Sequence, residues 1–591
     1  MSYLQAMKPG HSTAILRWMI FILLSNVILF LPITLAYLPM SGWTPWGGIA
    51  NVATEGRLSV FFLNHNYNPF RLQAEWTIAV LLVMSIRWRF PGNRWTIALL
   101  APIYVVILLF QIYYAVMHWI YGETPSFTNE FILMREVLPV YLAGNGIPNV
   151  LVWSGLIVFL VILLWLANVM ARRGVQTGTV LLHFTAGRII LALIPAFIAI
   201  SAYRYAKADP HDLRLNSQWV YPRIQDAFHV STEDPLDRLE ERSAIYQTWR
   251  KDQVQDLPNI YLIFIESYGA VAHLSSYVQE PFQATLKQLE DSLRADGWNS
   301  RSTYSLAPIK GGRSWLSFTS ALLGVKIRNQ VDYNRLYHLT FRYPHLIRYL
   351  NDLGYTTHRI NTMQTNEQTD ALIPYESVAT FHEFDDWVLF PDIPYQGYRY
   401  NSIGGIPDQY ALEHVWSSSI KGDSSPHMVF FITLDSHAPW FPPPPVAGVH
   451  TDLDTIRASP YGTDRSLDAD IMDRYLATME YEWTFLSQFI RRHATERDLF
   501  ILVGDHQPPA MEHQIWDQIN DYAVPLHVLA KSRNIDDFLA SNQFQSGLIP
   551  VVPDSVQWQH QGIFSLIRSL IVVQDTSRQA PARIQVFPEG I

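Results

Sequence analysis

Long apolar runs dominate the first third of the sequence. A helix that crosses a membrane needs about 20 consecutive, mainly apolar residues. Five stretches approach or exceed that length: 14–37, 72–86, 95–120, 150–170 and 180–203, of which 72–86 is the shortest. A cleavable signal peptide does not explain the first run, because such a peptide has a shorter apolar core and four more runs follow here. The pattern predicts a transmembrane domain of five helices over residues 1–204.

Positive charge is unevenly shared among the loops between these runs. The short loop 87–94 and the loop around Arg172 and Arg173 are rich in arginine, whereas the longer loops 38–71 and 121–149 hold few basic residues. Loops rich in Lys and Arg stay on the cytoplasmic side of a membrane. With five spans and a cytoplasmic N-terminus, everything after about residue 204 is expected outside the cytoplasmic membrane.

The pattern changes again after the last run. Residues 205–257 are polar and charged, which predicts a linker with juxtamembrane amphipathic helices. Over residues 258–591, short apolar runs alternate with helical stretches, and the clearest runs are 260–265, 428–434, 499–503 and 524–529. Continuous apolar strands that alternate with helices are typical of a mainly parallel sheet covered on both faces. This part is therefore expected to form an α/β domain.

Carboxylates and imidazoles directly follow three of these strands. Glu266 follows the first, Asp435 and His437 follow the second, and Asp505 and His506 follow the third after one glycine. In open α/β sheets, ligands bind at the carboxyl ends of the strands. A single acid or histidine there is often only a cap or a structural residue. Three such strand ends together predict a site for a divalent metal ion, because carboxylate oxygen and imidazole nitrogen suit Mn²⁺, Zn²⁺ or Mg²⁺.

A candidate nucleophile lies between these strands. Ser314 follows a Gly-Gly-Arg turn at the start of a predicted helix, where free N–H groups and the helix dipole favour an anion. A metal held by Glu266, Asp505 and His506 would lower the pKa of its hydroxyl. Two alternatives stay open: Ser314 serves only as an N-cap, or Ser267, directly after Glu266, is the nucleophile.

Composition narrows the possible functions. Only 16% of the residues are charged, against about 25% in soluble proteins, and 49% are hydrophobic. The net charge is −9 and there is no basic block, which argues against nucleic-acid binding. The absence of cysteine excludes disulfides, thiolate metal sites and cysteine nucleophiles. The apolar runs lack a ladder of acids or lysines, so the membrane domain is expected to be an anchor and not a transporter.

The order of these features resembles the lipoteichoic acid synthase family, a branch of the sulfatase and alkaline phosphatase superfamily. Phosphoethanolamine transferases of lipid A and the phosphoglycerol transferase of periplasmic glucans are similar. The resemblance covers nearly the whole chain. The features that carry it are five spans, Glu266-Ser267, Gly-Gly-Arg-Ser314, Ser436-His437-Ala438-Pro439 and Gly504-Asp505-His506.

The resemblance implies a sulfatase/alkaline-phosphatase-like fold and one divalent metal, Mn²⁺ or Mg²⁺ by preference and otherwise Zn²⁺. It implies metal ligation by Glu266, Asp505 and His506, with Ser314 as nucleophile and His437 in contact with the phosphate or headgroup. Ser314 would take the headgroup phosphate from phosphatidylglycerol or phosphatidylethanolamine and pass it to a glycan or glycolipid. The expected location is the bacterial cytoplasmic membrane, as a multi-pass protein with an extracytoplasmic, periplasmic catalytic domain.

Two departures from the family leave the headgroup open. The stretch 361–370 lacks the Trp and Arg that hold glycerol phosphate in lipoteichoic acid synthases, and the chain lacks the disulfides of the phosphoethanolamine branch. Phosphoglycerol transfer is the first expectation and phosphoethanolamine transfer the second; a phosphodiester hydrolase or a non-catalytic envelope protein comes third. Further candidates for substrate binding are Arg313, His358, Asn361 and His513.

Overall fold

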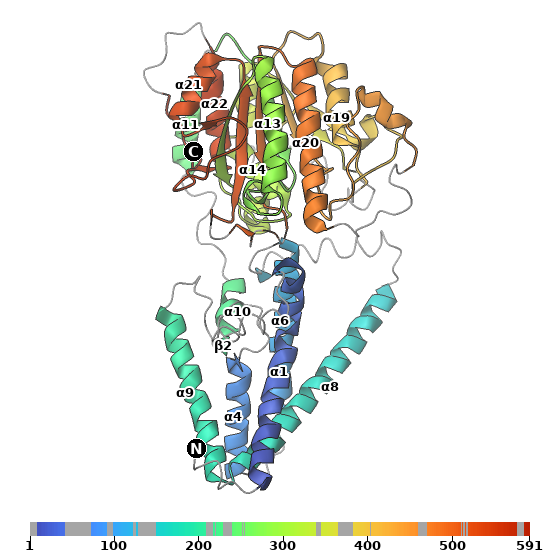
Figure 1. The fold of residues 1–591 in the computed structure, drawn as a ribbon. Helices are drawn as coiled ribbons and strands as arrows, with labels where there is room; N and C mark the ends of the chain where they lie inside the picture. Colours follow the sequence, from blue (N-terminus) through green and yellow to red (C-terminus); the bar gives the residue numbers. More distant parts are fainter. Residues whose placement is uncertain are drawn as a thin grey trace. The chain divides into compact units, whose positions relative to one another are not determined.

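The computed structural model describes two compact units (Figure 1). The first comprises most of residues 1–230, and the second comprises most of residues 231–591. The residues described are 9–41, 72–90, 98–121, 126–127, 149–207, 217–218, 220–228, 239–250, 252, 254–337, 344–363, 382–401, 404–458, 470–509, 511, 514–515, 518–575 and 584–591.

In the described part of the first unit, most of each predicted membrane span is helical. Its elements are α1 (Pro9–Ser41), β1 (Leu72–Gln73), α4 (Ala74–Arg89), α6 (Leu100–Tyr121), α8 (Asn149–Leu181), α9 (Thr185–Lys207), β2 (Ser217–Gln218) and α10 (Tyr221–Phe228). Within the described residues, three segments are long and apolar enough to cross a membrane: His11–Leu35, Leu100–Met117 and Ser154–Leu181. Helix α4 has 16 residues, and the apolar part of α9 is Thr185–Ile200. Both are shorter than about 20 residues, so a count of five spans stays a prediction.

The loop expected around Arg172 and Arg173 is wrong, because α8 continues through both arginines to Leu181. Charge marks a membrane boundary but does not end a helix. The continuation is held by packing through small residues: a side chain at Gly174 would collide with the Phe21 ring, and one at Gly178 with Met84. Glycines four residues apart let neighbouring helices approach closely, as small residues do in membrane helix pairs.

The second unit is built on one mixed sheet. Its strands are β3 (Asn259–Ile265), β4 (Asn299–Leu306), β5 (Thr356–Asn361), β6 (Asp386–Leu389), β7 (His427–Ile432), β8 (Asp498–Gly504), β9 (Ala523–Ala530), β10 (Gln545–Ser546) and β11 (Trp558–Gln559). The order is β10-β4-β9-β8-β3-β7-β5-β6, and β11 pairs with β4. Strands β8, β3, β7, β5 and β6 are parallel to one another, as expected, whereas β9 runs antiparallel to both β8 and β4. The predicted strand 524–529 is therefore confirmed as a strand, but it lies outside the parallel part of the sheet.

Helices cover both faces of this sheet. They are α11 (Leu239–Trp249), α12 (Val271–Leu274), α13 (Gln279–Ala295), α14 (Ser314–Leu323), α15 (Gln330–Tyr337), α16 (Leu346–Leu353), α19 (Asp408–Val415), α20 (Ile471–His493), α21 (Arg533–Ser541) and α22 (Gly562–Gln574), with the short turns η3 (Phe390–Asp392), η4 (Trp416–Ile420) and η5 (His450–Thr455). Alternate residues of β3 serve two cores. Tyr261 and Ile263 pack with α13 and α20, which lie side by side in Figure 1. Ile260 and Leu262 pack on the other face with α14, α16 and α22.

The register of the central strands brings their carboxyl ends to one place. Ile265 of β3 pairs with Gly504 of β8, and Phe264 pairs with Ile432 of β7. The residues that follow each strand therefore emerge together at one edge of the sheet, as expected for an α/β domain.

Gly504 is essential to this arrangement. A Cβ atom there would collide with the backbone carbonyl of Tyr268, in the turn that follows β3. Because backbone atoms cannot move aside as a flexible side chain can, we expect Gly504→Ala to destabilise the second unit by about 1–3 kcal/mol or more. Thermal unfolding of the full chain in detergent measures this. Gly448→Ala is the control, because a Cβ there meets open space; equal unfolding temperatures for the two variants would contradict the prediction.

Candidate metal centre and nucleophile

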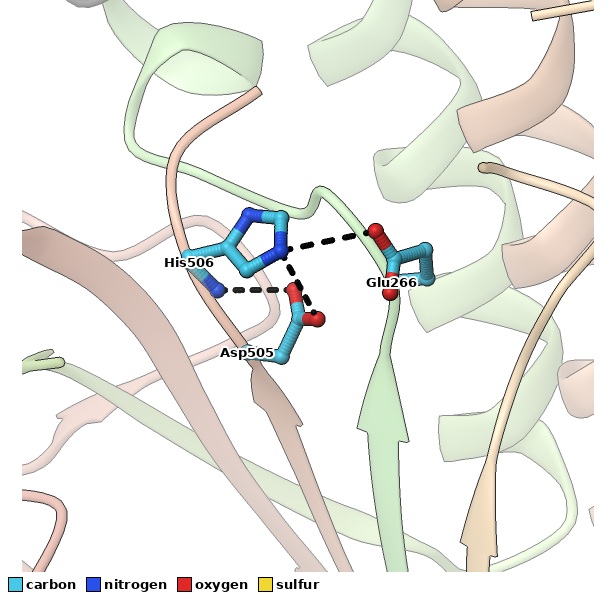
Figure 2. A group of neighbouring side chains, drawn as sticks. All are labelled: Glu266, Asp505 and His506. Carbon is cyan, nitrogen blue, oxygen red and sulfur yellow. Dashed lines mark hydrogen bonds and ion pairs between the residues drawn. The ribbon is translucent and has the colours of Figure 1, made fainter. Parts of the chain in front are cut away.

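Glu266, Asp505 and His506 converge at the carboxyl ends of β3 and β8. Each offers a ligand atom within 4.8 Å of those of the other two (Figure 2). The His506 Nε2 atom lies 3.5 Å from Glu266 Oε1 and 3.2 Å from Asp505 Oδ2. All three side chains are buried. The structure thus brings together the three residues predicted as metal ligands.

Hydrogen bonds around these residues leave suitable atoms facing one another. The ring atom Nδ1 of His506 lies 2.8 Å from the Gln507 carbonyl oxygen and therefore carries the hydrogen, which leaves the Nε2 lone pair toward the two carboxylates. Asp505 Oδ1 accepts hydrogen bonds from the backbone N–H groups of Ser267 and His506, while Asp505 Oδ2 accepts none from the described residues. A buried carboxylate oxygen without a donor, next to an imidazole lone pair, fits a cation site.

The pKa values of the three groups also indicate a cation site. Burial raises the pKa of Asp505 well above its ordinary value, and the neighbouring Glu266 raises it further. Burial also opposes ionisation of Glu266, but the pKa of that carboxyl is lowered, with hydrogen bonds from Asp505 and Ser314 among the causes. Burial lowers the pKa of His506, which keeps the ring neutral. Two carboxylates of this kind cannot both ionise without a compensating positive charge, and a divalent cation is such a charge.

Ser314 lies directly beside this group as the first residue of α14. Its Oγ donates to Glu266 Oε2 at 3.0 Å and lies 3.2 Å from His506 Nε2. Arg313 precedes it at φ 58°, an αL conformation that is uncommon for a residue other than glycine and turns the chain sharply into the helix. The N-cap position belongs to Arg313, so the alternative that Ser314 is merely the N-cap is wrong.

Ser267 occupies a different place in the site. It is fully buried, its Oγ donates to Glu266 Oε1 at 3.0 Å, and its carbonyl accepts a hydrogen bond from the Tyr475 hydroxyl. Ser314, in contrast, is partly exposed. A nucleophile must reach its substrate, so the geometry favours Ser314 for attack and gives Ser267 the task of orienting Glu266.

His437 and Arg313 lie close to the centre. His437 is half-buried in the loop after β7, and its ring influences the ionisation of both Glu266 and His506. Its Nδ1 lies 2.6 Å from the Ala438 carbonyl oxygen. Arg313 is buried and acts electrostatically on His506. Both residues therefore lie beside the candidate metal centre.

Of the remaining sequence candidates, His358 lies away from the centre. His358 hydrogen-bonds through Nδ1 to Asp386 and through Nε2 to His427, which are the first residues of β6 and β7, at the ends of those strands away from the metal ligands. Asn361 ends β5, and its Oδ1 accepts from the Met363 backbone. His513 lies outside the described residues.

Three supporting residues escape the sequence analysis. Thr433 Oγ1 accepts the Glu266 N–H at 3.1 Å, and the Ser317 hydroxyl donates to the Asp505 carbonyl. His560 Nε2 lies 3.0 Å from the Gly504 carbonyl oxygen. Thr433 stands at a strand end and could have been noticed by that position. His560 lies far along the chain, and no local pattern marks it.

The chain was compared with known families and proteins. The sulfatase family model matches residues 258–534, which begins where the sequence predicts the α/β domain to begin. No curated protein matches the chain. This match confirms the superfamily inferred from the motifs, and with it a sulfatase-like fold for this domain.

Several solved structures are similar to part of the chain. Lipoteichoic acid synthase LtaP from Listeria monocytogenes is 12% identical over 59% of this chain and 80% of its own, with a TM-score of 0.36. The periplasmic domain of EcEptC from Escherichia coli, in complex with Zn, is 15% identical over 55% of this chain and 88% of its own (TM-score 0.35). Phosphoglycerol transferase GacH from Streptococcus pyogenes, in complex with sn-glycerol-1-phosphate, is 10% identical over 60% and 89%, respectively (TM-score 0.35). At identities this low, none of these likenesses bears on activity.

Removing one ligand charge tests the metal centre. We expect Asp505→Asn to weaken metal binding by more than the about 10- to 100-fold that loss of an outer-shell partner causes. Elemental analysis of the purified full chain and calorimetric titration of the metal-depleted protein with Mn²⁺ measure this. Asp498→Asn, at the opposite end of β8 where Asp498 pairs with Asn259, should keep wild-type affinity. Unchanged affinity in Asp505→Asn would contradict the assignment.

Proposed function

We propose, on the premise that residues 258–534 form a domain of the sulfatase family, that the chain is a membrane-anchored, metal-dependent phosphotransferase with Ser314 as its nucleophile. One observation carries this proposal above the others. The Ser314 hydroxyl is partly exposed and lies within hydrogen-bond distance of Glu266 and His506, two of the three clustered ligand residues. A serine so placed is activated for attack on phosphorus.

In the first step, the metal ligands and Ser314 have different roles. A divalent metal bound by Glu266, Asp505 and His506 would supply charge stabilisation at the phosphoryl group and lower the pKa of the serine hydroxyl. Ser314 Oγ attacks the phosphorus of the donor; the Oγ–P bond forms, the bond from phosphorus to the diacylglycerol oxygen breaks, and the Oγ proton passes to Glu266 Oε2. In the resting site the Oγ–H donates to Glu266 Oε2, which orients the oxygen lone pairs away from that carboxylate.

The surrounding groups balance charge and protons during this step. We assign to His437, whose Nδ1 lies 2.6 Å from the Ala438 carbonyl oxygen, the donation of a proton from Nε2 to the departing diacylglycerol oxygen. The first-turn N–H groups of α14 and the buried Arg313 add positive potential for the phosphoryl oxygens. In the second step an acceptor hydroxyl attacks the phospho-serine and gives its proton to His437, while the Oγ–P bond breaks and Ser314 Oγ takes back the proton from Glu266, which restores the site and releases the product.

The membrane unit supports a lipid donor. Its three long apolar helices suit residence in a bilayer, where both a phospholipid donor and the diacylglycerol that leaves would reside. We propose phosphatidylglycerol as the donor, with transfer of phosphoglycerol to a glycan or glycolipid of the cell envelope. Phosphoethanolamine transfer from phosphatidylethanolamine to lipid A or a glycan is the alternative, and phosphodiester hydrolysis, with water as acceptor, comes third.

The ligand set bears on the metal. Two carboxylates and one imidazole suit Mn²⁺ or Mg²⁺, and Zn²⁺ accepts the same donors. We propose Mn²⁺ or Mg²⁺ as the resident ion. The proposed organisation is a transmembrane domain over 1–204, a juxtamembrane linker over 205–257 and an extracytoplasmic catalytic domain over 258–591, in the bacterial cytoplasmic membrane.

Replacing the nucleophile tests the function. We expect Ser314→Ala to lower release of diacylglycerol by about a thousand-fold or more, because removing a nucleophile removes the covalent route. Ser314→Thr, which keeps a hydroxyl at the same position, should retain measurable activity. The assay uses the detergent-purified full chain with Mn²⁺, Mg²⁺ or Zn²⁺, labelled phosphatidylglycerol or phosphatidylethanolamine, and envelope extract as acceptor.

Two outcomes would contradict the proposal. One is wild-type release by Ser314→Ala. The other is no release from either lipid by folded, metal-loaded wild-type protein. Release from only one of the two lipids would identify the headgroup.

A further inference from the structure

Three carboxyl groups lie buried together behind the strand end that carries His437. Asp408 is the first residue of α19, Asp435 follows β7, and Glu482 lies in the middle of α20. Their exposed fractions are 0%, 3% and 0%, respectively. None of them belongs to the metal centre, and the reaction described above does not use them.

Asp408 and Asp435 hold each other through the backbone. Asp408 Oδ2 accepts the N–H groups of Leu434 at 2.7 Å and of Asp435 at 2.6 Å. In return, Asp435 Oδ2 accepts the Asp408 N–H at 2.8 Å, and Asp435 Oδ1 accepts from Asn401 Nδ2 at 3.0 Å. These bonds fasten the start of α19 to the loop that follows β7.

Glu482 has no such support. Both of its oxygens are buried without a hydrogen-bond partner among the described residues, and the same holds for Asp408 Oδ1, which faces it. The Tyr481 hydroxyl, from the same helix, faces Asp435 and also lacks a partner in the described part of the chain. An unpaired buried polar group costs about 1–3 kcal/mol. One hydrogen atom between the carboxyl groups of Glu482 and Asp408 would satisfy an oxygen of each.

Among the described residues, no basic side chain neutralises these three carboxyl groups. Within the described residues, no Lys, Arg or His forms an ion pair with Asp408, Asp435 or Glu482, although other acids of the unit have such partners. The only described group of acids and histidines whose ligand atoms all approach within 4.8 Å is the metal centre. Three carboxylates without a counter-charge cannot all remain ionised in the interior.

We propose that Glu482 is a neutral carboxylic acid whose O–H donates to Asp408 Oδ1, and that this shared proton holds the His437 loop in place. Glu482 carries the proton because Asp408 and Asp435 are stabilised as anions by backbone N–H groups, whereas Glu482 accepts none. Glu482 is thus a positioning residue and touches neither substrate nor metal.

Ser436 and Thr433 lie between the shared proton and the reactive centre. The Ser436 hydroxyl faces Glu482 and lies 3.3 Å from Thr433 Oγ1, which in turn accepts the Glu266 N–H. His437 is the next residue after Ser436. Loss of the proton would put a second negative charge beside Asp408 and push apart the segments that set the position of His437. This consequence for catalysis rests on the proposed function, whereas the shared proton itself does not.

The titratable groups that face Glu482 in the described structure are Asp408 from α19, Asp435 from the loop after β7, and Tyr481 from α20 itself. Burial raises the pKa of Glu482 well above its ordinary value, and Asp408 and Asp435 raise it further. Burial raises the pKa of Asp408 in the same direction and that of Asp435 to about 6. Backbone N–H groups oppose this rise in pKa for Asp408 and Asp435, whereas none among the described residues does so for Glu482.

The sign of the pH effect follows from this. The folded chain holds the Glu482 proton over a pH range in which the unfolded chain has already lost it. The stabilisation is complete below the ordinary glutamic acid pKa of about 4.3 and is lost progressively as the pH rises toward the folded-state pKa. A glutamine at this position has no proton to lose, and its N–H₂ group can donate to Asp408 in the same way.

Thermal unfolding of the full chain in detergent, from pH 5.5 to pH 9, tests the proposal without reference to activity. We expect the unfolding temperature of Glu482→Gln to rise relative to that of the wild type by a few degrees across this range. The matched control is Glu480→Gln, two residues earlier on the same helix, where Glu480 is half-buried and accepts from Thr285 Oγ1. The difference in unfolding temperature between Glu480→Gln and the wild type should not change with pH.

Infrared spectroscopy identifies the protonation state directly. In a detergent without ester groups at pH 7, the wild-type minus Glu482→Gln difference spectrum should contain the C=O band of a carboxylic acid. The Glu480→Gln difference should contain carboxylate bands instead. Carboxylate bands in the Glu482→Gln difference would overturn the proposal. So would a rise in wild-type unfolding temperature on adding Ca²⁺ or Na⁺ that Glu482→Gln abolishes, because the site would then hold a cation.

An activity profile separates this proposal from the proposed function. If the chain releases diacylglycerol, Glu482→Gln should keep wild-type turnover at pH 7. At pH 9 it should retain a fraction of that turnover at least about twofold larger than the fraction that the wild type retains. If turnover by Glu482→Gln and by the wild type fell equally between pH 7 and pH 9, the proposed effect of the shared proton on His437 would be overturned. If no lipid is turned over, the proposed function fails, while the infrared and unfolding results still decide the shared proton.

Discussion

Parallel pairing between β3 and β8 places Ile265 opposite Gly504, and the reactive centre depends on that register. The next residues along the two strands, Glu266 and Asp505, emerge side by side, and His506 completes the group one residue later. A shift by one residue would turn these side chains to the other face of the sheet. Gly504 protects the register, because only a residue without a side chain lets the Tyr268 carbonyl pass this close.

Burial of like charges is the cost of this geometry, and it recurs in two places. At the strand ends, Glu266 and Asp505 are buried beside a neutral imidazole, with one carboxylate oxygen lacking a donor. Behind β7, Asp408, Asp435 and Glu482 are buried with no described counter-charge. We propose a divalent metal as the compensation in the first case and a proton in the second. The difference follows from the arrangement of the atoms, since only the first group has its ligand atoms within 4.8 Å of one another.

Much of this architecture follows from local pattern. Apolar strands that end in Glu266, His437 or Asp505 could be found because strand and acid are adjacent in sequence, and Ser314 could be found from its glycine turn. The antiparallel strand β9 could not be foreseen, because a fully buried strand has the same apolar sequence in either direction. The continuation of α8 past Arg172 and Arg173 depends on contacts with α1 and α4, which no local pattern contains. His560 and Glu482 support the site from distant helices or turns, and only the fold brings them near.

In the proposed reaction, Ser314 carries the headgroup phosphate as a covalent intermediate. Acid-quenched protein, taken after mixing the metal-loaded full chain with donor lipid in the absence of acceptor, can be digested and analysed by mass spectrometry. We expect a headgroup phosphate on the peptide that contains Ser314, and no such adduct in metal-depleted protein. An adduct on Ser267, or diacylglycerol release with no covalent adduct at all, would contradict it.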